Sequence, residues 1–211
     1  MRTIIFDVES TGTSRPQICQ LAYIIVSDGS IIGRNYFFTV DAMNRYAYKV
    51  HHLSMSTLKN LSHGQRFGDR VGEISRDFGS ADVYAGHGVS GDIDYLKREF
   101  TLLNMKLPER MRFCTMTHFT GRCTDAVLPT GKPKPPRLSE LWEHFSLTET
   151  DIAKFAHSLF GDCNGAHDAR FDATATYLSM QRAARAGELP TGVLPMGVGA
   201  AAPRQPLAVS G

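Results

Sequence analysis

The chain has 211 residues, of which 42% are hydrophobic and 21% are charged. This composition lies within the ordinary range of soluble proteins and allows one substantial core but hardly two. The formal net charge of only +2 excludes a protein that coats nucleic acid through a surface of one sign. The four cysteines have neither zinc-ligand nor disulfide-scaffold spacing, and we see no signal peptide and no apolar run of membrane-spanning length. We therefore expect a cytoplasmic protein with reduced thiols and no membrane partner.

The first 40 residues are predicted to form three strands, because residues 3–8, 18–26 and 31–40 are rich in β-branched and aromatic side chains. The pair Asp28-Gly29 between the second and third strands is typical of a hairpin turn. We expect these three strands to form an antiparallel meander.

The middle of the chain is predicted to alternate between helices and strands. A helix is expected after Ser54, and a second helix places Val71, Ile74 and Phe78 on one face. The elements expected next are a strand at residues 83–85, a helix with its N-cap at Ser90 and a strand at residues 112–116.

Residues 121–137 are rich in glycine and proline and contain Lys132, Lys134 and Arg137, which predicts a loop without regular structure. Two interpretations of its charge stay open: a solvated linker and a segment that follows a phosphate backbone.

Three further helices are expected at residues 138–145, 152–160 and 169–186. After them, residues 187–211 shift to glycine, proline, alanine and valine, which predicts a flexible tail. The sequence thus predicts one α/β domain at residues 1–186. Its sheet would be mixed and five-stranded, with three antiparallel strands followed by parallel ones, and helices would flank it.

The first strand carries a pair of acidic residues, Asp7 and Glu9. Side chains alternate along a strand, so both acids project from one face, while Phe6 and Val8 project from the other. Aspartate is disfavoured in strands, so its position needs an explanation. One explanation is a functional site on an exposed edge, and the other is a solvent-facing edge strand with two acids by chance.

Two later segments end on acids at the start of helices. His87 is followed by a turn of small residues and then by Asp92, and His167 precedes Asp172 in the last long helix. Taken singly, each aspartate can be explained by the unpaired N–H groups and the dipole at a helix start. The remaining histidines, including His51, are interpreted as surface or packing residues.

Together the three segments resemble the DEDDh (DnaQ-like) family of 3′→5′ exonucleases, which includes RNase T, oligoribonuclease and a proofreading subunit of bacterial DNA polymerase. The resemblance covers residues 3–184 and depends on five matching positions, which are Asp7, Glu9, Asp92, His167 and Asp172. It implies an RNase H-like fold and a catalytic role for these five residues. The chain departs from the family pattern at Thr13, Gly88 and Gly91, which puts the neighbouring substrate contacts in question.

The resemblance also suggests which residues contact substrate, namely Ser10, Thr11, Gly12, His52 and His87. The expected substrate is the 3′ end of single-stranded DNA or RNA, and the expected products are nucleoside 5′-monophosphates. The choice between DNA and RNA stays open because it depends on whether the site accepts the 2′-hydroxyl.

Four carboxylates in one pocket repel one another strongly, and divalent cations would relieve the repulsion. Hard oxygen ligands and a phosphate substrate favour two Mg²⁺ ions, with Mn²⁺ as a substitute. The expected metal ligands are Asp7, Glu9, Asp92 and Asp172. His167 is the expected general base, because imidazole is mostly neutral at the pH of the cytoplasm.

Two other functions remain as alternatives. An RNase H-like endonuclease uses a similar carboxylate set, and a catalytically idle module would bind nucleic acid or dock onto a polymerase. The tail at residues 187–211 resembles, in placement and character, the extension by which the family's proofreading subunit attaches to its polymerase, and this resemblance suggests a DNA polymerase as a protein partner. The sequence leaves open whether the protein is a monomer or a homodimer.

Overall fold

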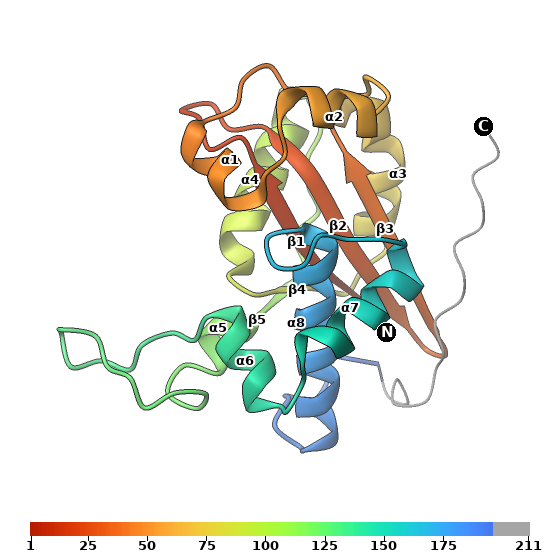
Figure 1. The fold of residues 1–211 in the computed structure, drawn as a ribbon. Coiled ribbons are helices and arrows are strands. Elements are labelled where there is room, and N and C mark those ends of the chain that lie inside the picture. The colour runs from red at the N-terminus through yellow and green to blue at the C-terminus, as the bar shows by residue number, and fades with distance from the viewer. Residues whose placement is uncertain (196–211) are drawn as a thin grey trace.

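The computed structural model describes residues 1–195, which form one mixed five-stranded sheet with helices on both faces (Figure 1). The strand order is β3-β2-β1-β4-β5; β2 pairs antiparallel with β1 and β3, and β4 pairs parallel with β1 and β5. The strands are β1 Arg2–Ser10, β2 Ile18–Ser27, β3 Ser30–Phe37, β4 Val83–Gly86 and β5 Met111–Cys114. The α/β class and the mixed sheet predicted from the sequence are confirmed.

Eight helices connect and cover these strands within the described residues. They are α1 Arg45–His51, α2 Met55–Leu61, α3 Phe67–Gly79, α4 Val89–Leu102, α5 Thr115–His118, α6 Leu138–His144, α7 Glu149–Phe160 and α8 Ala169–Arg185. The sequence analysis missed α1, which buries only His51, and α5, which has four residues, so neither shows a hydrophobic period. It also extended the third strand to Val40 and the fifth to Met116, although β3 ends at Phe37 and β5 at Cys114.

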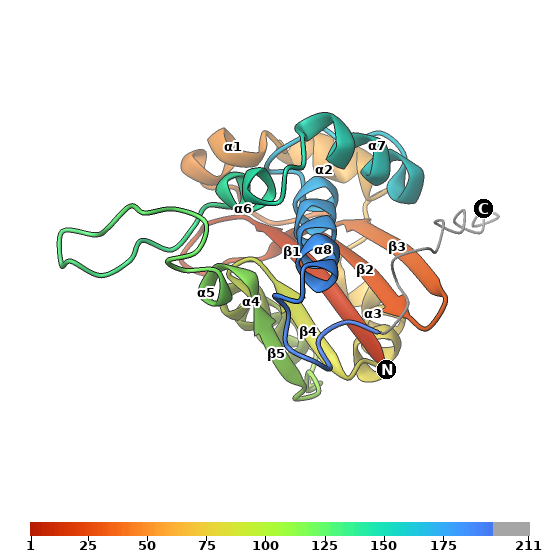
Figure 2. The ribbon, with the colours of Figure 1, turned by 90° about the horizontal axis from the view of Figure 1, so that it is seen from below.

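The central strand β1 divides the interior into two hydrophobic cores. On one face, Ile4 and Phe6 pack with residues of α3 and α4, and on the other face Ile5 packs with residues of α7 and α8. Figure 2 shows α3 and α4 on one side of the sheet and α7 and α8 on the other. The alternation of side chains along β1 therefore decides which of its residues can face α8.

The chain after α8 continues along the folded domain up to Pro195. Val193 is buried, its carbonyl oxygen accepts a 2.7 Å hydrogen bond from Thr3 Oγ1, and Leu189 and Leu194 pack against the core on the α8 side. The rest of the predicted tail, residues 196–211, lies outside the described residues. Within residues 1–195, no helix has both the length and the apolar character needed to cross a membrane.

Candidate active site

Asp7 and Glu9 lie near the carboxyl end of β1, on the face that α8 covers. They follow Ile5 at intervals of two residues, and Ile5 belongs to the core beneath α8. The predicted exposed edge is wrong, because β1 is the central strand and Glu9 is only 9% exposed. The same observation rules out the alternative of a solvent-facing edge strand.

The sheet leaves room beside these two acids. β4 pairs with β1 only as far as Ile5, while β2 continues to pair opposite Asp7 and Glu9. Beyond Ile5 the chain of β4 turns away into α4. One side of the acidic end of β1 therefore faces the start of a helix instead of a neighbouring strand.

Asp92 is brought to this gap by the first turn of α4. The turn before the helix requires Gly88, whose φ of 89° is a conformation that side-chain-bearing residues rarely adopt. Gly88 is also the N-cap, so the prediction of Ser90 as N-cap is wrong and α4 begins at Val89. The glycine that departs from the family pattern is thus the residue that this turn needs.

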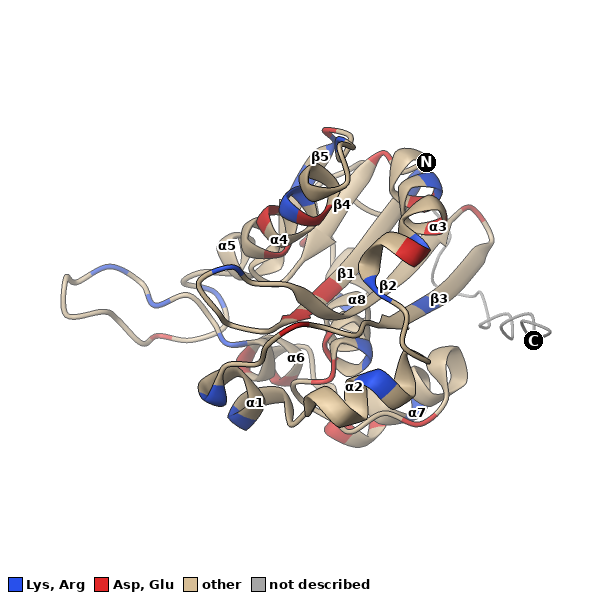
Figure 3. Cartoon of the chain, turned by 90° about the horizontal axis from the view of Figure 1, so that it is seen from above, with Lys and Arg blue, Asp and Glu red and all other residues tan. Residues whose placement is uncertain are grey.

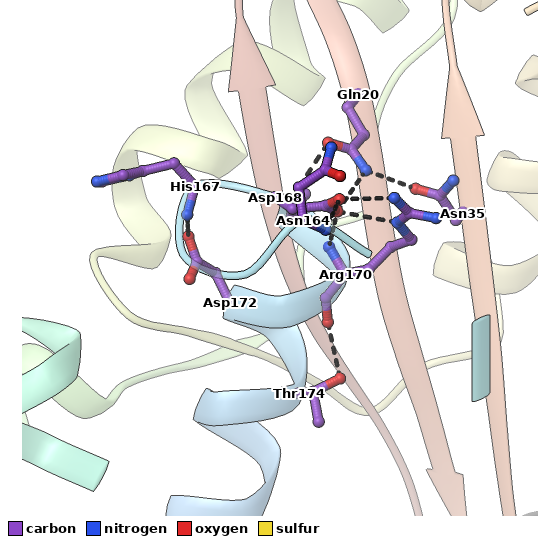
Figure 4. Close-up of polar contacts among 9 residues, drawn as sticks. Gln20, Asn35, Asn164, His167, Asp168, Arg170, Asp172 and Thr174 are labelled. Atoms are coloured by element: carbon purple, nitrogen blue, oxygen red, sulfur yellow. Dashed lines mark hydrogen bonds and ion pairs between the residues drawn. The ribbon is translucent and has the colours of Figure 1, made fainter. Parts of the chain in front are cut away.

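His167 and Asp172 come from the loop before α8 and from the first turn of that helix. His167 is exposed and has a φ of 65°, and its backbone N–H donates a 3.1 Å hydrogen bond to Asp172 Oδ2 (Figure 4). One potential metal-ligand atom from each of Glu9, His167 and Asp172 lies within 4.8 Å of the other two. Residues separated by more than 150 positions in the sequence therefore meet in one place.

The four carboxylates interact electrostatically. Burial, followed by the charges of Asp92 and Asp168, raises the pKa of Asp7 well above its ordinary value. Burial is also the largest cause for the other three, and neighbouring acids add to it, so that the pKa of Glu9 rises to about 10 and those of Asp92 and Asp172 to about 8. Among residues 1–195, no lysine or arginine forms an ion pair with any of the four.

A fifth acid, Asp168, is buried beside this group but is neutralised within the protein. Its carboxylate receives hydrogen bonds from Arg170 at 2.9 and 2.6 Å and from Gln20 Nε2 at 2.9 Å (Figure 4). It also caps α8 by accepting from the Arg170 N–H, and it accepts from the Asn164 N–H. Burial raises the pKa of Asp168, but these bonds and the charge of Arg170 lower it below its ordinary value.

The sequence analysis missed this Asp168–Arg170 pair. Two signals were present: Asp168 stands at a helix N-cap position, and Gln20 is a polar residue inside the otherwise apolar strand β2. Gln20 also donates to Asn35 on β3 and accepts from the Ala169 N–H. The network therefore attaches the start of α8, which carries Asp172, to two strands of the sheet.

The residues that follow Glu9 pack closely against the start of α1. Ser10 is half-buried, and Thr11 is buried and holds the backbone of Gln17 and of Asn44 through hydrogen bonds. Gly12 has a φ of 60°, and a Cβ atom there would lie 2.9 Å from the Cβ of Ala47. Gly12 thus allows α1 to approach the acidic end of β1.

Two of the predicted substrate contacts are histidines with different surroundings. His52 ends α1 in a left-handed conformation with an exposed side chain. His87 is half-buried, with Nδ1 3.0 Å from Thr115 Oγ1 and Nε2 3.0 Å from the carbonyl oxygen of Pro136, to which it donates. Both ring nitrogens of His87 therefore have partners inside the protein.

His51, interpreted from the sequence as a packing residue, is buried near the site. Its Nδ1 accepts a 3.0 Å hydrogen bond from the Leu53 N–H. Burial is the main cause that lowers its pKa, and the charges of His52 and His167 contribute. The α1–α2 connection therefore reaches the neighbourhood of His167.

The donor set fits divalent cations better than any organic group. Carboxylate oxygens are hard ligands suited to Mg²⁺ and Mn²⁺. Burial and the neighbouring acids raise the pKa values of all four carboxyl groups, so their ionised forms are unfavourable in the folded chain. A bound divalent cation would remove this repulsion.

The structure is similar to solved structures of Exonuclease I from E. coli. The complex with a dT13 oligonucleotide aligns at a TM-score of 0.64 and 14% identity over 89% of this chain and 42% of that chain. The zinc-bound form of the complex with single-stranded DNA aligns at a TM-score of 0.65 and 14% identity over 88% of this chain and 40% of that chain. The likeness shows that the chain has the RNase H-like fold of that exonuclease and spans less than half of its length. The sequence itself matches no family model and no curated protein.

Proposed function

We propose that the protein is a metal-dependent 3′→5′ exonuclease of the DEDDh type. It hydrolyses phosphodiester bonds at the 3′ end of a single-stranded nucleic acid and releases nucleoside 5′-monophosphates. The observation that carries this proposal is the meeting of acids from β1, α4 and α8 in one electrostatically interacting group beside an exposed imidazole. The likeness to Exonuclease I supports a nuclease, and its oligonucleotide complexes make single-stranded DNA the first substrate to test.

Asp7, Glu9, Asp92 and Asp172 are the residues that would hold the metal, with Mg²⁺ as the expected ion and Mn²⁺ as a substitute. When bound, two such ions supply an activated water and offset the charge that develops on the phosphate under attack. The chain positions these ligands on β1 and on the first turns of two helices, so that none depends on a flexible loop.

His167 is proposed as the general base. A ring nitrogen of His167 lies within 4.8 Å of potential ligand atoms of Glu9 and Asp172, so the imidazole stands beside two of the proposed metal ligands. The backbone bond to Asp172 attaches the end of the α7–α8 loop to the first turn of α8, while the exposed ring can release the proton to solvent. Replacing His167 with alanine is expected to lower kcat by about 10²–10⁴-fold with a much smaller change in KM, measured by steady-state kinetics. An unchanged kcat would remove His167 from the mechanism.

The direct test of the function uses 3′-labelled single-stranded DNA and RNA with Mg²⁺ or with a chelator. We expect stepwise loss of the 3′ label that the chelator stops. The matched pair Asp92→Asn and Asp94→Asn serves as the control, because both acids lie near the start of α4 but Asp94 is exposed. Activity lost in Asp92→Asn and kept in Asp94→Asn supports the assignment, whereas equal activity of the two variants contradicts it.

A circular single strand distinguishes the proposed function from an RNase H-like endonuclease. An exonuclease leaves the circle intact, and an endonuclease makes it linear. Binding of 3′ ends without any cleavage in Mg²⁺ or Mn²⁺ would favour the idle docking module instead.

A further inference from the structure

The segment that the sequence analysis treated as a loop, residues 121–137, projects from the body of the protein as an arm. Figures 1 and 2 show it extending well away from the sheet and the helices in both views. Backbone bonds from Leu128 to Lys132 and from Lys134 to Ala126 make it an irregular two-stranded hairpin, and an isolated bridge joins Val127 and Pro133. The arm therefore has a backbone shape of its own, and its contacts with the rest of the domain lie near its two ends, where Cys123 packs against a small core and Lys134 pairs with Glu140.

Both ends of the arm are fixed close to the acidic site. At its start, Phe119 is fully buried directly after α5, which follows the Cys114 whose charge contributes to the raised pKa of Asp92. At its end, the Pro136 carbonyl accepts from His87, the residue that follows β4. The arm thus leaves the domain at the edge of the sheet where Asp92 lies, and about six extended residues give it a reach of roughly 20 Å.

The charge of the arm differs from that of the rest of the chain. It contains four basic residues and one acidic residue, whereas the whole chain has a formal net charge of only +2 (Figure 3). Lys134 and Arg137 form ion pairs with Glu140 at the base of the arm. Arg122 and Lys132 are exposed and have no ion-pair partner among residues 1–195.

The arm offers no aromatic side chain and no large apolar surface. Val127 and Leu128 are its exposed large hydrophobic residues, and stacking on bases would need rings that residues 121–137 lack. Exposed cations on an ordered hairpin suit the phosphate backbone of a nucleic acid, which is recognised by charge and without reading sequence.

We infer that the arm is a second nucleic-acid contact, which holds the phosphate backbone of the substrate several nucleotides before its 3′ end through Arg122 and Lys132. This inference rests on the proposed function, because the 3′ end must lie at the carboxylate site for the strand to pass along the arm. A long strand then binds at two places, and a substrate of one nucleotide binds at the carboxylate site alone.

The test compares the double variant Arg122→Ala/Lys132→Ala with the control Arg76→Ala/Lys106→Ala. Arg76 and Lys106 are also exposed and without an ion pair among residues 1–195, but Arg76 lies near the end of α3 and Lys106 lies between α4 and β5. Both are therefore near the amino ends of β4 and β5, whereas the arm follows the carboxyl end of β5. The full chain is titrated with a fluorescein-labelled single-stranded 20-mer in chelator at several salt concentrations, so that binding is measured without cleavage.

For the arm variant we expect weaker binding of the 20-mer and a salt dependence that is shallower by about 0.7 for each cation removed, or roughly 1.4 in the slope of log K against log salt. The KM for a labelled 20-mer in Mg²⁺ is expected to rise with the Kd. Hydrolysis of the p-nitrophenyl ester of thymidine 5′-monophosphate, which cannot reach the arm, reports any damage to the site itself.

Equal salt slopes for the arm variant, the control and the parent overturn the inference. So does an equal loss of activity on the ester and on the 20-mer, which would make the arm a structural support. A change from dimer to monomer in light scattering with an unchanged salt slope would assign the arm to a second copy of the chain. If the parent cleaves neither substrate, the proposed function fails, while the salt slopes still decide the role of the arm.

Discussion

Asp168 and a group of four other acids, Asp7, Glu9, Asp92 and Asp172, lie near the start of α8. The protein shifts the pKa of Asp168 and the pKa values of the other four in opposite directions. Asp168 is buried with Arg170, and its pKa lies below the ordinary value. Asp7, Glu9, Asp92 and Asp172 are held together without an arginine or lysine partner among the described residues, and their pKa values are raised. Figure 4 shows His167 and Asp172 on one side of the loop into α8 and Asp168 with its partners on the other.

The difference shows that the acid that stabilises the start of α8 is distinct from the acids proposed to bind metal. The Asp168–Arg170 pair is complete and links α8 to β2 and β3 through Gln20. The four other carboxyl groups have no such partner among the described residues, and burial together with their mutual repulsion makes their ionised forms unfavourable. The network of Asp168, Arg170 and Gln20 thus stabilises the start of α8 beside the four carboxyl groups that the proposed function assigns to the metal.

The largest expected effect is the loss of cleavage activity when one of the four proposed metal ligands, Asp172, loses its charge. Asp172→Asn should lower Mg²⁺-dependent cleavage by at least about 10³-fold, because a metal ion supplies several kcal/mol to phosphoryl chemistry. The same variant should raise the melting temperature of the metal-free protein at pH 8, because one source of repulsion is gone. Kinetics and thermal melts in chelator check the two effects together. If Asp172→Asn loses activity but has a lower melting temperature than the parent in chelator, the claim that repulsion among the four carboxylates destabilises the metal-free protein is contradicted.

A smaller effect is expected from breaking the paired group. Arg170→Ala leaves Asp168 as an uncompensated buried charge, which should lower the free energy of unfolding by about 3–5 kcal/mol. The control is Arg182→Ala, an exposed position on the same helix, with an expected change within about 0.5 kcal/mol. Urea unfolding at pH 7 measures both.

The double variant Asp168→Asn/Arg170→Met tests whether the loss of stability in Arg170→Ala comes from the unpaired charge of Asp168. It leaves no buried charge, so it should recover much of the stability that Arg170→Ala loses. If Arg170→Ala is no less stable than Arg182→Ala, the pair does not support α8 as described.

The pH dependence of the metal-free protein tests the four carboxyl groups without a substitution. Between the ordinary carboxyl pKa of about 4 and the values of about 8 for Asp92 and Asp172, the folded chain binds more protons than the unfolded chain. The free energy of unfolding should therefore fall as the pH rises from 5 to 8, by linkage. Melts in chelator across this range, repeated with Asp172→Asn, measure the slope, which should be shallower in the variant. A stability that rises with pH would contradict the raised pKa values of Asp92 and Asp172.

Much of this arrangement could be predicted from residues close together in the sequence. The alternation in β1 placed Asp7 and Glu9 on one face, and Asp28-Gly29 marked the β2–β3 hairpin. The sequence could not show that β1 is central, because that depends on its parallel pairing with β4, almost 80 residues later. Asp168 and Arg170 were missed for the same reason, since their third partner, Gln20, comes from a distant strand.

Calorimetric titration of the metal-free protein with Mn²⁺ or Mg²⁺ tests the central claim most directly, when it is performed at pH 7 in two buffers with different ionisation enthalpies. Carboxyl groups with raised pKa values must lose protons to become ligands, so the account expects two ions per chain and a net release of protons on binding. Proton release should decrease in Asp7→Asn and remain unchanged in Asp94→Asn. Absence of binding, or binding that neither releases protons nor depends on Asp7, would contradict the account.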